Sequence, residues 1–327
     1  METYNFLDAS PYQASKDFFM TLSIQNSRFY KVAEHQFSVS VCNGLCDDFF
    51  AKNMDNYEPF AVSECDCIFS LDIVAGEKAP SFVEEIRQDE EGQLIICGLT
   101  DAGESVFEFW LFDKYVGSLV CSKDYSSSTL FVPNSEKDDK GDNSSYLKFA
   151  VNNALMVFYA IATSPYNTAL FHAAVVKYQG RGYMFLGKSG TGKSTHARLW
   201  LKYNEGSELL NDDNPVVRFY ATADGKGYAK VFGSPWSGKT PCYKNEECVL
   251  GGLVLLSQAP YNKIIRLRTV QAYAAIHPCI SGKRWDRTLA DGLHATENSL
   301  ISNVPVWYLE CLPDEAAAKL CLKTVAE

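Results

Sequence analysis

The chain has 327 residues, of which 46% are hydrophobic and 13% aromatic, which is enough apolar surface for two domains with separate cores. Its formal net charge of −10 argues against sequence-independent nucleic-acid binding, which depends on many lysine and arginine contacts to phosphate. No window approaches the roughly 18 uninterrupted apolar residues of a membrane-spanning helix, and the first residues lack the basic and apolar regions of a signal peptide. We therefore expect a cytoplasmic protein without nucleic-acid or membrane partners.

Residues 1–145 predict a β-rich N-terminal domain of unknown role. Short alternating or apolar runs such as FAVSECDCIFSLDIV and SVFEFWLF are separated by Gly, Asp and Asn, which is the pattern of strands and turns. A charged stretch at about 134–145 indicates the domain junction, and a second domain follows over residues 146–327. Eleven cysteines, an odd number without a secretion signal, fit reduced thiols better than a disulfide framework.

The C-terminal domain predicts a mixed sheet with flanking helices, so the fold class we expect is α/β (α+β). The apolar stretch YLKFAVNNALMVFYAIATSP predicts a buried helix, and three hairpins are expected within residues 170–187, 215–233 and 249–269. Hairpins pair their strands antiparallel, whereas common P-loop NTPases use mainly parallel sheets. Further helices are expected at 269–277, 284–302 and 314–325, with a strand at 304–312.

The phosphate-binding pattern GxxxxGK[ST] occurs twice, at Gly187–Ser194 and at Gly233–Thr240. The first match follows an apolar run and precedes a helical repeat, so it predicts a strand, a loop and a helix whose N-terminus faces the phosphates. The second match contains Pro235, which has no N–H to donate, and Trp236, which is bulky where the loop must approach oxygens. We assign nucleotide binding to the first match and expect the second to lie at the mouth of the site.

The first match supplies the residues expected to bind ATP. Lys193 is expected to compensate charge on the β- and γ-phosphates, and the hydroxyl of Ser194 to bind Mg²⁺. The other residues expected around the phosphates are Gly187, Ser189, Gly190, Thr191, Gly192 and Thr195.

Two adjacent acids, Asp212 and Asp213, end the apolar strand that follows the expected helix. One can hold Mg²⁺ while the other accepts a proton from an attacking hydroxyl; Asp212 is our candidate metal ligand, and the division of roles stays open. The alternative is that they only cap the turn before Pro215. His172 lies on the strand expected to pair with the one entering the loop, where it can touch the transferred phosphoryl group or orient a carboxylate. A histidine satisfied within the core is an equal alternative.

The second match supplies the candidates for acceptor binding: Trp236, Ser237 and Lys239, of which Lys239 could bind an anionic acceptor. Four arginines are further candidates for binding phosphate or carboxylate, although solvated surface charge is the favoured alternative for each. They are Arg266, Arg268, Arg284 and Arg287.

The order FHAAVVKYQGRGYMFLGKSGTGKSTHARLW followed by LLNDDNPVV resembles the HPr kinase/phosphorylase and phosphoenolpyruvate carboxykinase superfamily over residues 146–240. The resemblance implies ATP, Mg²⁺ and phosphoryl transfer, with Asp212 and Asp213 as metal ligand and base. His172 matches a histidine of HPr kinases, whereas Thr195 stands where those enzymes have Glu. The stretch PWSGKTPCYKNEECVLGG is similar to small bacterial HPr-kinase-like proteins whose substrates are unassigned, so HPr itself is not implied as acceptor.

The leading hypothesis is an ATP- and Mg²⁺-dependent kinase that phosphorylates a hydroxyl of a small molecule or a protein. Two alternatives stay open: a nucleotide-binding regulatory protein or degenerate kinase, and a compact carboxykinase-like enzyme. The sequence specifies neither the acceptor nor whether the chain forms a homo-oligomer.

Overall fold

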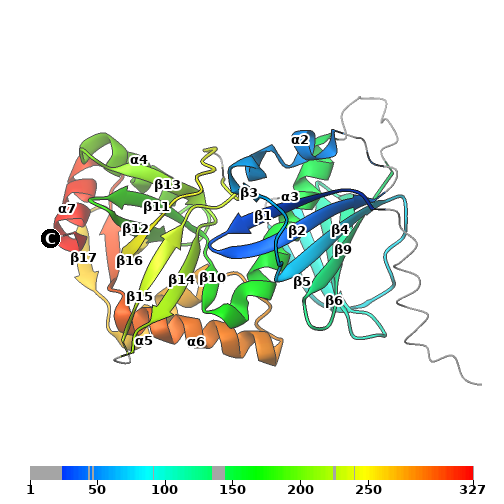
Figure 1. The fold of residues 1–327 in the computed structure, drawn as a ribbon. Helices are drawn as coiled ribbons and strands as arrows, with labels where there is room; N and C mark the ends of the chain where they lie inside the picture. Colours follow the sequence, from blue (N-terminus) through cyan, green and yellow to red (C-terminus); the bar gives the residue numbers. More distant parts are fainter. Residues whose placement is uncertain are drawn as a thin grey trace, which may run out of the picture.

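The structure, a computed structural model, describes residues 24–42, 45, 48–90, 92–134, 144–223, 226–238 and 240–326. Two β-sheets lie side by side, with helices between and around them (Figure 1). Most of the predicted junction at about 134–145 lies outside the described residues, as does Lys239.

The N-terminal sheet has the strand order β3-β1-β2-β4-β9-β8-β7-β6-β5, and only the pairs β2/β4 and β4/β9 are parallel. Its strands are β1 (Ile24–Val32), β2 (His35–Cys42), β3 (Ala61–Val62), β4 (Phe69–Ala75), β5 (Val83–Glu90), β6 (Gln93–Leu99), β7 (Ser105–Leu111), β8 (Lys114–Cys121) and β9 (Ser127–Val132). A short helix, α2 (Phe49–Asn53), lies between β2 and β3. The β-rich character predicted for this part of the chain is confirmed.

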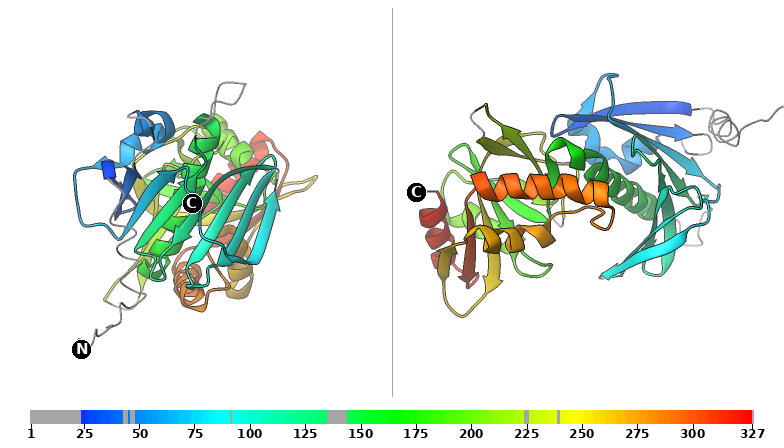
Figure 2. Two further views of the ribbon diagram at one scale, coloured as in Figure 1. Left: turned by 90° about the vertical axis from the view of Figure 1, so that its right-hand side faces the viewer. Right: turned by 90° about the horizontal axis from the view of Figure 1, so that it is seen from below.

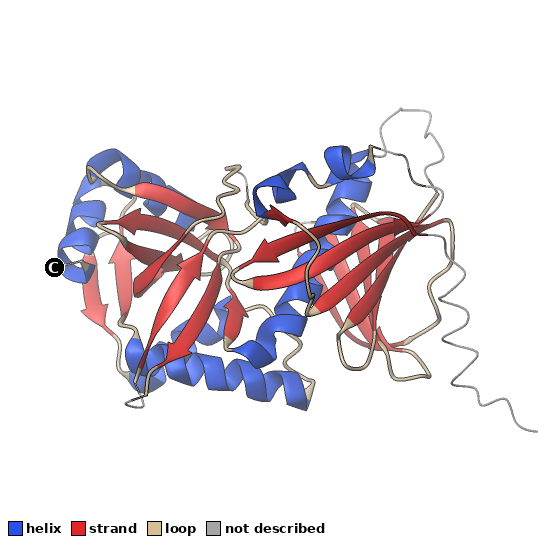
Figure 3. Ribbon diagram, in the orientation of Figure 1, coloured by secondary structure: helices blue, strands red, loops and turns tan. Residues whose placement is uncertain are grey.

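The helix α3 (Ser144–Thr163) packs on the N-terminal sheet and lies between the two sheets (Figure 3). The ring centroid of Phe158 lies 4.7 Å from that of Phe69, and Tyr159 is 6.2 Å from Phe37. The predicted helix is therefore confirmed. Its apolar side chains belong to the same buried cluster as the N-terminal strands, and this cluster also contains Leu170, Val216 and Trp236. The C-terminal domain that the sequence predicts from residue 146 thus begins with a helix that packs on the N-terminal sheet.

The C-terminal sheet is mixed, as predicted, with the strand order β10-β14-β15-β16-β12-β11-β13 and with β18 and β17 extending it beside β16. Its strands are β10 (Thr168–Leu170), β11 (Ala173–Tyr178), β12 (Arg181–Leu186), β13 (Glu208–Asp213), β14 (Val216–Ala221), β15 (Gly227–Phe232), β16 (Glu247–Gln258), β17 (Lys263–Arg266) and β18 (Val306–Cys311). The pairs β12/β16 and β16/β18 are parallel, and the other pairs are antiparallel.

Two of the three predicted hairpins are confirmed, β11–β12 and β14–β15. The third prediction, a hairpin of β16 with β17, is wrong, because β18 lies between them and pairs with both. β18 carries the buried Val306, Trp307 and Leu309, whereas β17 is mostly exposed. Inserting the more apolar strand beside β16 therefore buries more apolar surface than a local hairpin would.

Four further helices match the predicted ones: α4 (Lys193–Tyr203), α5 (Thr269–Ile276), α6 (Arg287–Asn303) and α7 (Glu315–Val325). These helices cover opposite faces of the sheet (Figure 2). Successive side chains of β12 point to opposite faces, and Phe185 packs with α4 and α7 whereas Met184 packs with α5 and α6. Within the described ranges, no helix is long and apolar enough to cross a membrane. The cysteines of these ranges are free thiols.

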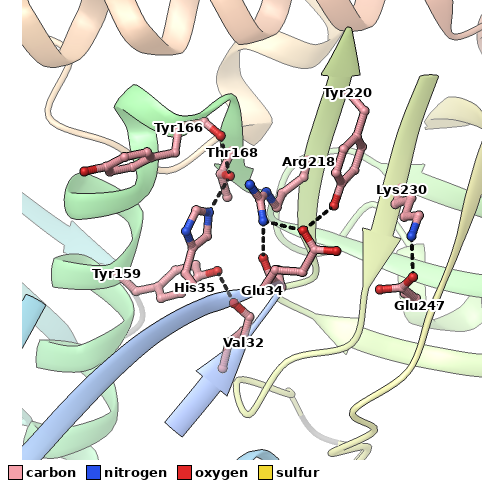
Figure 4. A network of polar contacts seen from close by, with 11 residues as sticks. Val32, Glu34, His35, Tyr159, Tyr166, Thr168, Arg218, Tyr220, Lys230 and Glu247 are labelled. Atoms are coloured by element: carbon pink, nitrogen blue, oxygen red, sulfur yellow. Dashed lines mark hydrogen bonds and ion pairs between the residues drawn. The ribbon is translucent and has the colours of Figure 1, made fainter. Parts of the chain in front are cut away.

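The turn between β1 and β2 joins the two sheets through Glu34 (Figure 4). Its carboxylate lies 2.6 Å from a guanidinium nitrogen of Arg218 and accepts a hydrogen bond of 2.9 Å from the hydroxyl of Tyr220, both on β14. Arg218 also donates to the carbonyl of Ala33 at 3.1 Å. One turn of the N-terminal sheet is thus fixed to an arginine of the C-terminal sheet.

His35, the first residue of β2, is buried at the same interface. The hydroxyl of Thr168 donates to the carbonyl of Tyr166 at 3.0 Å, so it accepts the 2.8 Å hydrogen bond from Nε2 of His35. Burial, followed by the charge of Arg218, lowers the pKa of His35 to about 3. His35 is therefore a neutral hydrogen-bond donor at the domain interface.

Candidate functional site

The first phosphate-loop match connects β12 to α4 through a backbone that only glycine adopts easily. Gly187, Gly190 and Gly192 have φ angles of 147°, 78° and 102°. A Cβ on Gly187 would lie 2.5 Å from Oγ1 of Thr191, whereas at Gly190 nothing lies within 4 Å. The loop therefore closes tightly on its own threonine and leaves open space at its outer turn.

Thr191 and Lys193 hold the loop in shape. The backbone N–H and the hydroxyl of Thr191 both donate to the carbonyl of Lys188, at 3.2 and 2.7 Å. The ammonium of Lys193 donates to the carbonyls of Gly187 at 3.0 Å and Lys188 at 3.3 Å. Lys193 is 8% exposed and forms no ion pair with any residue in the described part of the chain. A buried cation that only carbonyls contact is suited to receive an anion.

The same lysine begins α4, whose N-terminus is open to an anion. The N-cap is Gly192, no side chain caps the helix, and its first turn contains no acidic residue. The first N–H groups of an α-helix have no partner within the helix, and the helix dipole favours negative charge there. Ser194 and Thr195, which are half-buried and exposed, belong to this first turn, as the sequence predicted.

The two predicted acids end β13, which pairs antiparallel with β11 and places Asp212 opposite Ala174 and Asp213 opposite Ala173. Asp212 is 4% exposed, and its Oδ1 has no hydrogen-bond partner among the residues that the structure describes. A buried carboxylate oxygen without a donor is costly, and a bound cation would satisfy it. The donor set of a carboxylate with the Ser194 hydroxyl fits Mg²⁺, which prefers oxygen ligands.

Asp213 is held by its neighbours on both carboxylate oxygens. Oδ1 lies 3.3 Å from Nε2 of His172, and Oδ2 accepts a hydrogen bond of 2.8 Å from the side-chain amide of Asn214. The backbone N–H of Asp213 donates to Asn211 at 3.1 Å. Burial raises the pKa of Asp213, and the nearby charges of His172 and Lys193 oppose that rise. This carboxylate therefore has a fixed orientation and an increased affinity for a proton.

His172 directly precedes β11 and lies beside the glycine loop. Burial and then the charge of Lys193 lower its pKa, while Asp213 and Glu90 oppose this. Its backbone N–H donates to the carbonyl of Cys279 at 2.7 Å. The structure thus brings His172, Asp213 and Lys193 within electrostatic range of one another, as the strand pairing predicted.

The second match lies beside the two acids, as expected, but its residues do not all have the positions that the sequence predicted for acceptor binding. Ser237 forms an isolated β-bridge with Asp213, and the backbone N–H of Gly238 donates to the carbonyl of Asp212 at 2.8 Å. A Cβ on Gly238 would lie 2.9 Å from that carbonyl oxygen, so the close approach requires glycine. The predicted acceptor residue Lys239 lies outside the described residues.

Trp236 does not line the site in the way we expected. Its side chain is 4% exposed, its indole N–H donates to the hydroxyl of Tyr57 at 2.8 Å, and its ring lies 5.0 Å from that of Tyr159. Both partners belong to the N-terminal core. Trp236 therefore joins the domains by packing, and a buried indole cannot contact an acceptor.

Two residues near the loop have no role in the sequence prediction. Gln258, at the end of β16, donates to the carbonyl of Gly190 at 3.2 Å. Because β16 runs parallel to β12, the carboxyl ends of both strands meet at the same edge, so this position could have been found once that pairing was recognised. Cys279 accepts a hydrogen bond from the backbone N–H of Gly187, and no sequence pattern marks it.

Arg284 forms a separate cluster and is not a phosphate ligand. Its guanidinium donates to Glu297, which is fully buried, at 2.9 Å, and lies 3.1 Å from Nδ1 of His277. The donor atoms of His277, His294 and Glu297 lie within 4.8 Å of one another, which is short enough for a metal site. The guanidinium already neutralises Glu297 there, so this cluster supports the fold rather than a metal.

Comparisons with known proteins do not indicate a function, so a functional inference rests on the geometry of the site. No protein-family model matches the chain, and a search of curated proteins finds no match.

A pocket of about 630 Å³ on the N-terminal domain is lined by residues 76–82 and by Tyr115, Ser118 and Asn134, among others. It contains none of the site residues described above, so it offers no alternative location for their chemistry.

Proposed function

We propose that the chain is an ATP- and Mg²⁺-dependent phosphotransferase that transfers the γ-phosphoryl group to a hydroxyl acceptor. The observation that carries the proposal is the convergence of a buried lysine and two carboxylates at one edge of the sheet. The negative charges of Asp213 and Asp212 both act on Lys193, because they oppose the lowering of its pKa by burial. Separate segments of the chain supply this lysine and these acids, at the start of α4 and the end of β13.

The glycine loop and the start of α4 would bind the triphosphate. The N–H groups at the start of α4 have no side-chain cap, and Lys193 can exchange two carbonyl contacts for phosphate oxygens without leaving the loop. Hydrogen bonds to charged groups contribute about 1.5–3 kcal/mol each. Several such bonds give a nucleotide affinity in the usual range for enzymes.

Asp212 and Ser194 would hold Mg²⁺, and the fit rests on the unpartnered Oδ1 of Asp212. When bound, the ion neutralises phosphate charge. Asp212 suits a ligand better than a base, because it is more deeply buried than Asp213 and only the latter contacts a histidine. This division assigns the two roles that the sequence left open.

Asp213 would accept the proton of the acceptor. The hydroxyl oxygen of the acceptor forms a bond to the γ-phosphorus, the bond from that phosphorus to the β–γ bridging oxygen breaks, and ADP leaves with the electron pair. The hydroxyl proton moves to Asp213, whose raised pKa favours proton uptake. Nε2 of His172 holds the carboxylate in place on the side opposite Asn214.

The test uses γ-³²P-ATP with Mg²⁺, purified protein and desalted cell extract as a mixed source of protein acceptors, with a small-metabolite fraction run in parallel. The wild-type chain and the exposed control Asp291→Asn should label an acceptor, whereas Asp213→Asn should not, with nucleotide affinity alike in all three. Equal labelling by Asp213→Asn would remove its role as base. Absence of both labelling and ATP hydrolysis in the wild-type chain would contradict the activity.

A further inference from the structure

The strand β5 is an open edge of the N-terminal sheet. It ends the strand order and pairs only with β6. Among the residues that the structure describes, no backbone hydrogen bond joins its outer edge to another segment. All eight of its side chains are exposed, including Val83 at 70% and Ile86 at 46%. A strand of this length presents about 26 Å of unpaired N–H and C=O groups.

An open edge of this kind binds an extended peptide by adding it to the sheet. Main-chain hydrogen bonds then supply affinity, and the side chains of the edge strand select the sequence. The strand β5 itself carries four acidic side chains, Glu84, Glu85, Asp89 and Glu90, and one basic side chain, Arg87. That arginine is already held by Glu84 through bonds of 2.9 and 2.8 Å.

The acidic charge distinguishes between the possible occupants of the edge. Like charges placed opposite one another across a strand pair are destabilising, so two copies of β5 repel each other. A segment rich in Lys and Arg has the complementary charge. It is attracted mainly to Asp89 and Glu90, because Glu84 is paired with Arg87 and Glu85 with Lys283.

Side-chain contacts join β5 to the segment of the chain that leads to the candidate site. Glu85 accepts a hydrogen bond of 3.0 Å from the indole N–H of Trp285 and lies 3.6 Å from the ammonium of Lys283. The segment just before Lys283 pairs with the chain at the site, through a bridge between Ile280 and Phe171. Phe171 directly precedes His172 in the chain. The segment from Ile280 to Lys283 therefore connects β5 to the site.

One end of β5 lies near the candidate site. Glu90, its last residue, is within electrostatic range of His172, which itself contacts Asp213. Glu90 shares a face of the sheet with Gln88 and Ile86, because each of them pairs with a residue on the same face of β6 as the buried Cys97. A peptide bound along β5 would thus pass Glu90 at the end of the strand, within electrostatic range of His172.

We propose that the outer edge of β5 binds an extended basic peptide as an added strand and leads a serine or threonine hydroxyl of that peptide to Asp213. This assignment rests on the proposed phosphotransferase function and narrows its acceptor to a polypeptide. The side chains of Ile86 and Val83 offer apolar contacts for alternate residues of the bound strand.

Binding is tested without nucleotide, by fluorescence anisotropy of two labelled ten-residue peptides that alternate Thr or Val with either Lys or Glu and contain one serine near an end. The lysine peptide should bind, and the glutamate peptide should bind at least about tenfold more weakly. Asp89→Lys/Glu90→Lys should weaken the lysine peptide by a similar factor. The control Asp101→Lys, at an exposed turn of the same sheet, should not. N-methylation of alternate backbone nitrogens in the lysine peptide should also abolish its binding, because it removes strand hydrogen bonds.

Equal binding of both peptides, or binding that the double substitution leaves unchanged, would overturn the inference. Self-association of the chain that the double substitution abolishes would assign the edge to a second copy and overturn it as well. These results are independent of the proposed activity. A chain that binds Mg²⁺·ATP and phosphorylates a small molecule, yet ignores both peptides, would disprove the peptide site alone.

Discussion

Nε2 of His172 lies 3.3 Å from Oδ1 of Asp213, and the contact joins the residue before β11 to the last residue of β13. The antiparallel register makes this contact, because it places Ala173 directly opposite Asp213. Burial changes the pKa of the two groups in opposite directions, lowering that of His172 and raising that of Asp213. The first change favours a neutral imidazole, and the second increases the affinity of the Asp213 carboxylate for a proton.

Replacing His172 should therefore slow transfer without weakening nucleotide binding. We expect His172→Ala to lower kcat roughly 10- to 100-fold, because proton transfer depends on the position of the base. His172→Gln, which keeps a donor, should recover part of the loss. Steady-state kinetics with a fixed acceptor and calorimetry with Mg²⁺·ATP would measure the two quantities. Equal rates for the Ala and Gln variants would show that the contact between His172 and Asp213 plays no part.

Substitutions of the two adjacent acids should have different effects on the rate and on its Mg²⁺ dependence. Asp213→Asn removes the proposed base and should lower kcat about 10²- to 10⁴-fold, with the Mg²⁺ dependence unchanged. Asp212→Asn removes the proposed metal ligand and should raise the Mg²⁺ concentration for half-maximal activity at least about tenfold, since losing even an outer-shell partner costs about 10–100-fold in metal affinity. Rate measurements over a Mg²⁺ series would separate them. The reverse pattern would exchange the two roles.

Trp236 should contribute to stability rather than to acceptor binding. Trp236→Ala removes a buried aromatic that joins the two domains, and large-to-small changes of this kind cost about 3–5 kcal/mol. Tyr57→Phe leaves the indole N–H without its acceptor and should cost about 1–3 kcal/mol. Urea unfolding monitored by circular dichroism gives both values. The half-exposed control Trp285→Ala should cost less than about 1 kcal/mol, and a similar cost for Trp236→Ala would contradict the packing role.

The stability of the chain should decrease in acid in part through His35. Its pKa in the folded chain is about 3, below the ordinary value of 6.5, so between these values the unfolded chain binds more protons. The free energy of unfolding therefore falls as pH is lowered through this window, by up to about 1.4 kcal/mol per pH unit from this one residue. His196, with its pKa lowered to about 4 by burial, acts in the same direction.

His35→Gln keeps a donor for Thr168 but cannot titrate. Between about pH 4 and 6, the slope of the free energy of unfolding against pH should decrease in this variant by an amount that corresponds to about one bound proton. His294→Gln, at an exposed position of α6, serves as the control and should leave the slope unchanged. An unchanged slope in His35→Gln would show that the histidine is already protonated in the folded chain.

Much of the local structure could be predicted because it depends on short sequence patterns. The strand, the glycine loop and the helix from β12 to α4 follow from alternation, glycine spacing and helical repeat, and the structure agrees. The hairpin of β11 with β12 was predicted, and it places His172 near the glycine loop. The contact of His172 with Asp213 depends instead on the pairing of β11 with β13, which joins segments far apart in the sequence and was not predicted.

Long-range pairing could not be predicted in the same way. The strand β18 inserts between β16 and β17 because it buries more apolar surface there, and that choice depends on the whole sheet. The same holds for Trp236. A tryptophan between Pro235 and Ser237 in a loop gives no sign that Tyr57 and Tyr159, which are far away in the sequence, will cover it. Cys279 reaches the glycine loop through tertiary packing alone.

The proposed phosphotransferase depends above all on binding of the phosphates of ATP by the loop around Lys193. Calorimetric titration with Mg²⁺ and a non-hydrolysable ATP analogue measures this binding. We predict one site per chain for the wild type. Lys193→Met should weaken binding by at least about 10- to 100-fold, because it removes charge-assisted hydrogen bonds. The control Lys202→Met, at the exposed far end of α4, should match the wild type. Absence of binding in the wild type, or equal affinity in Lys193→Met, would contradict the account.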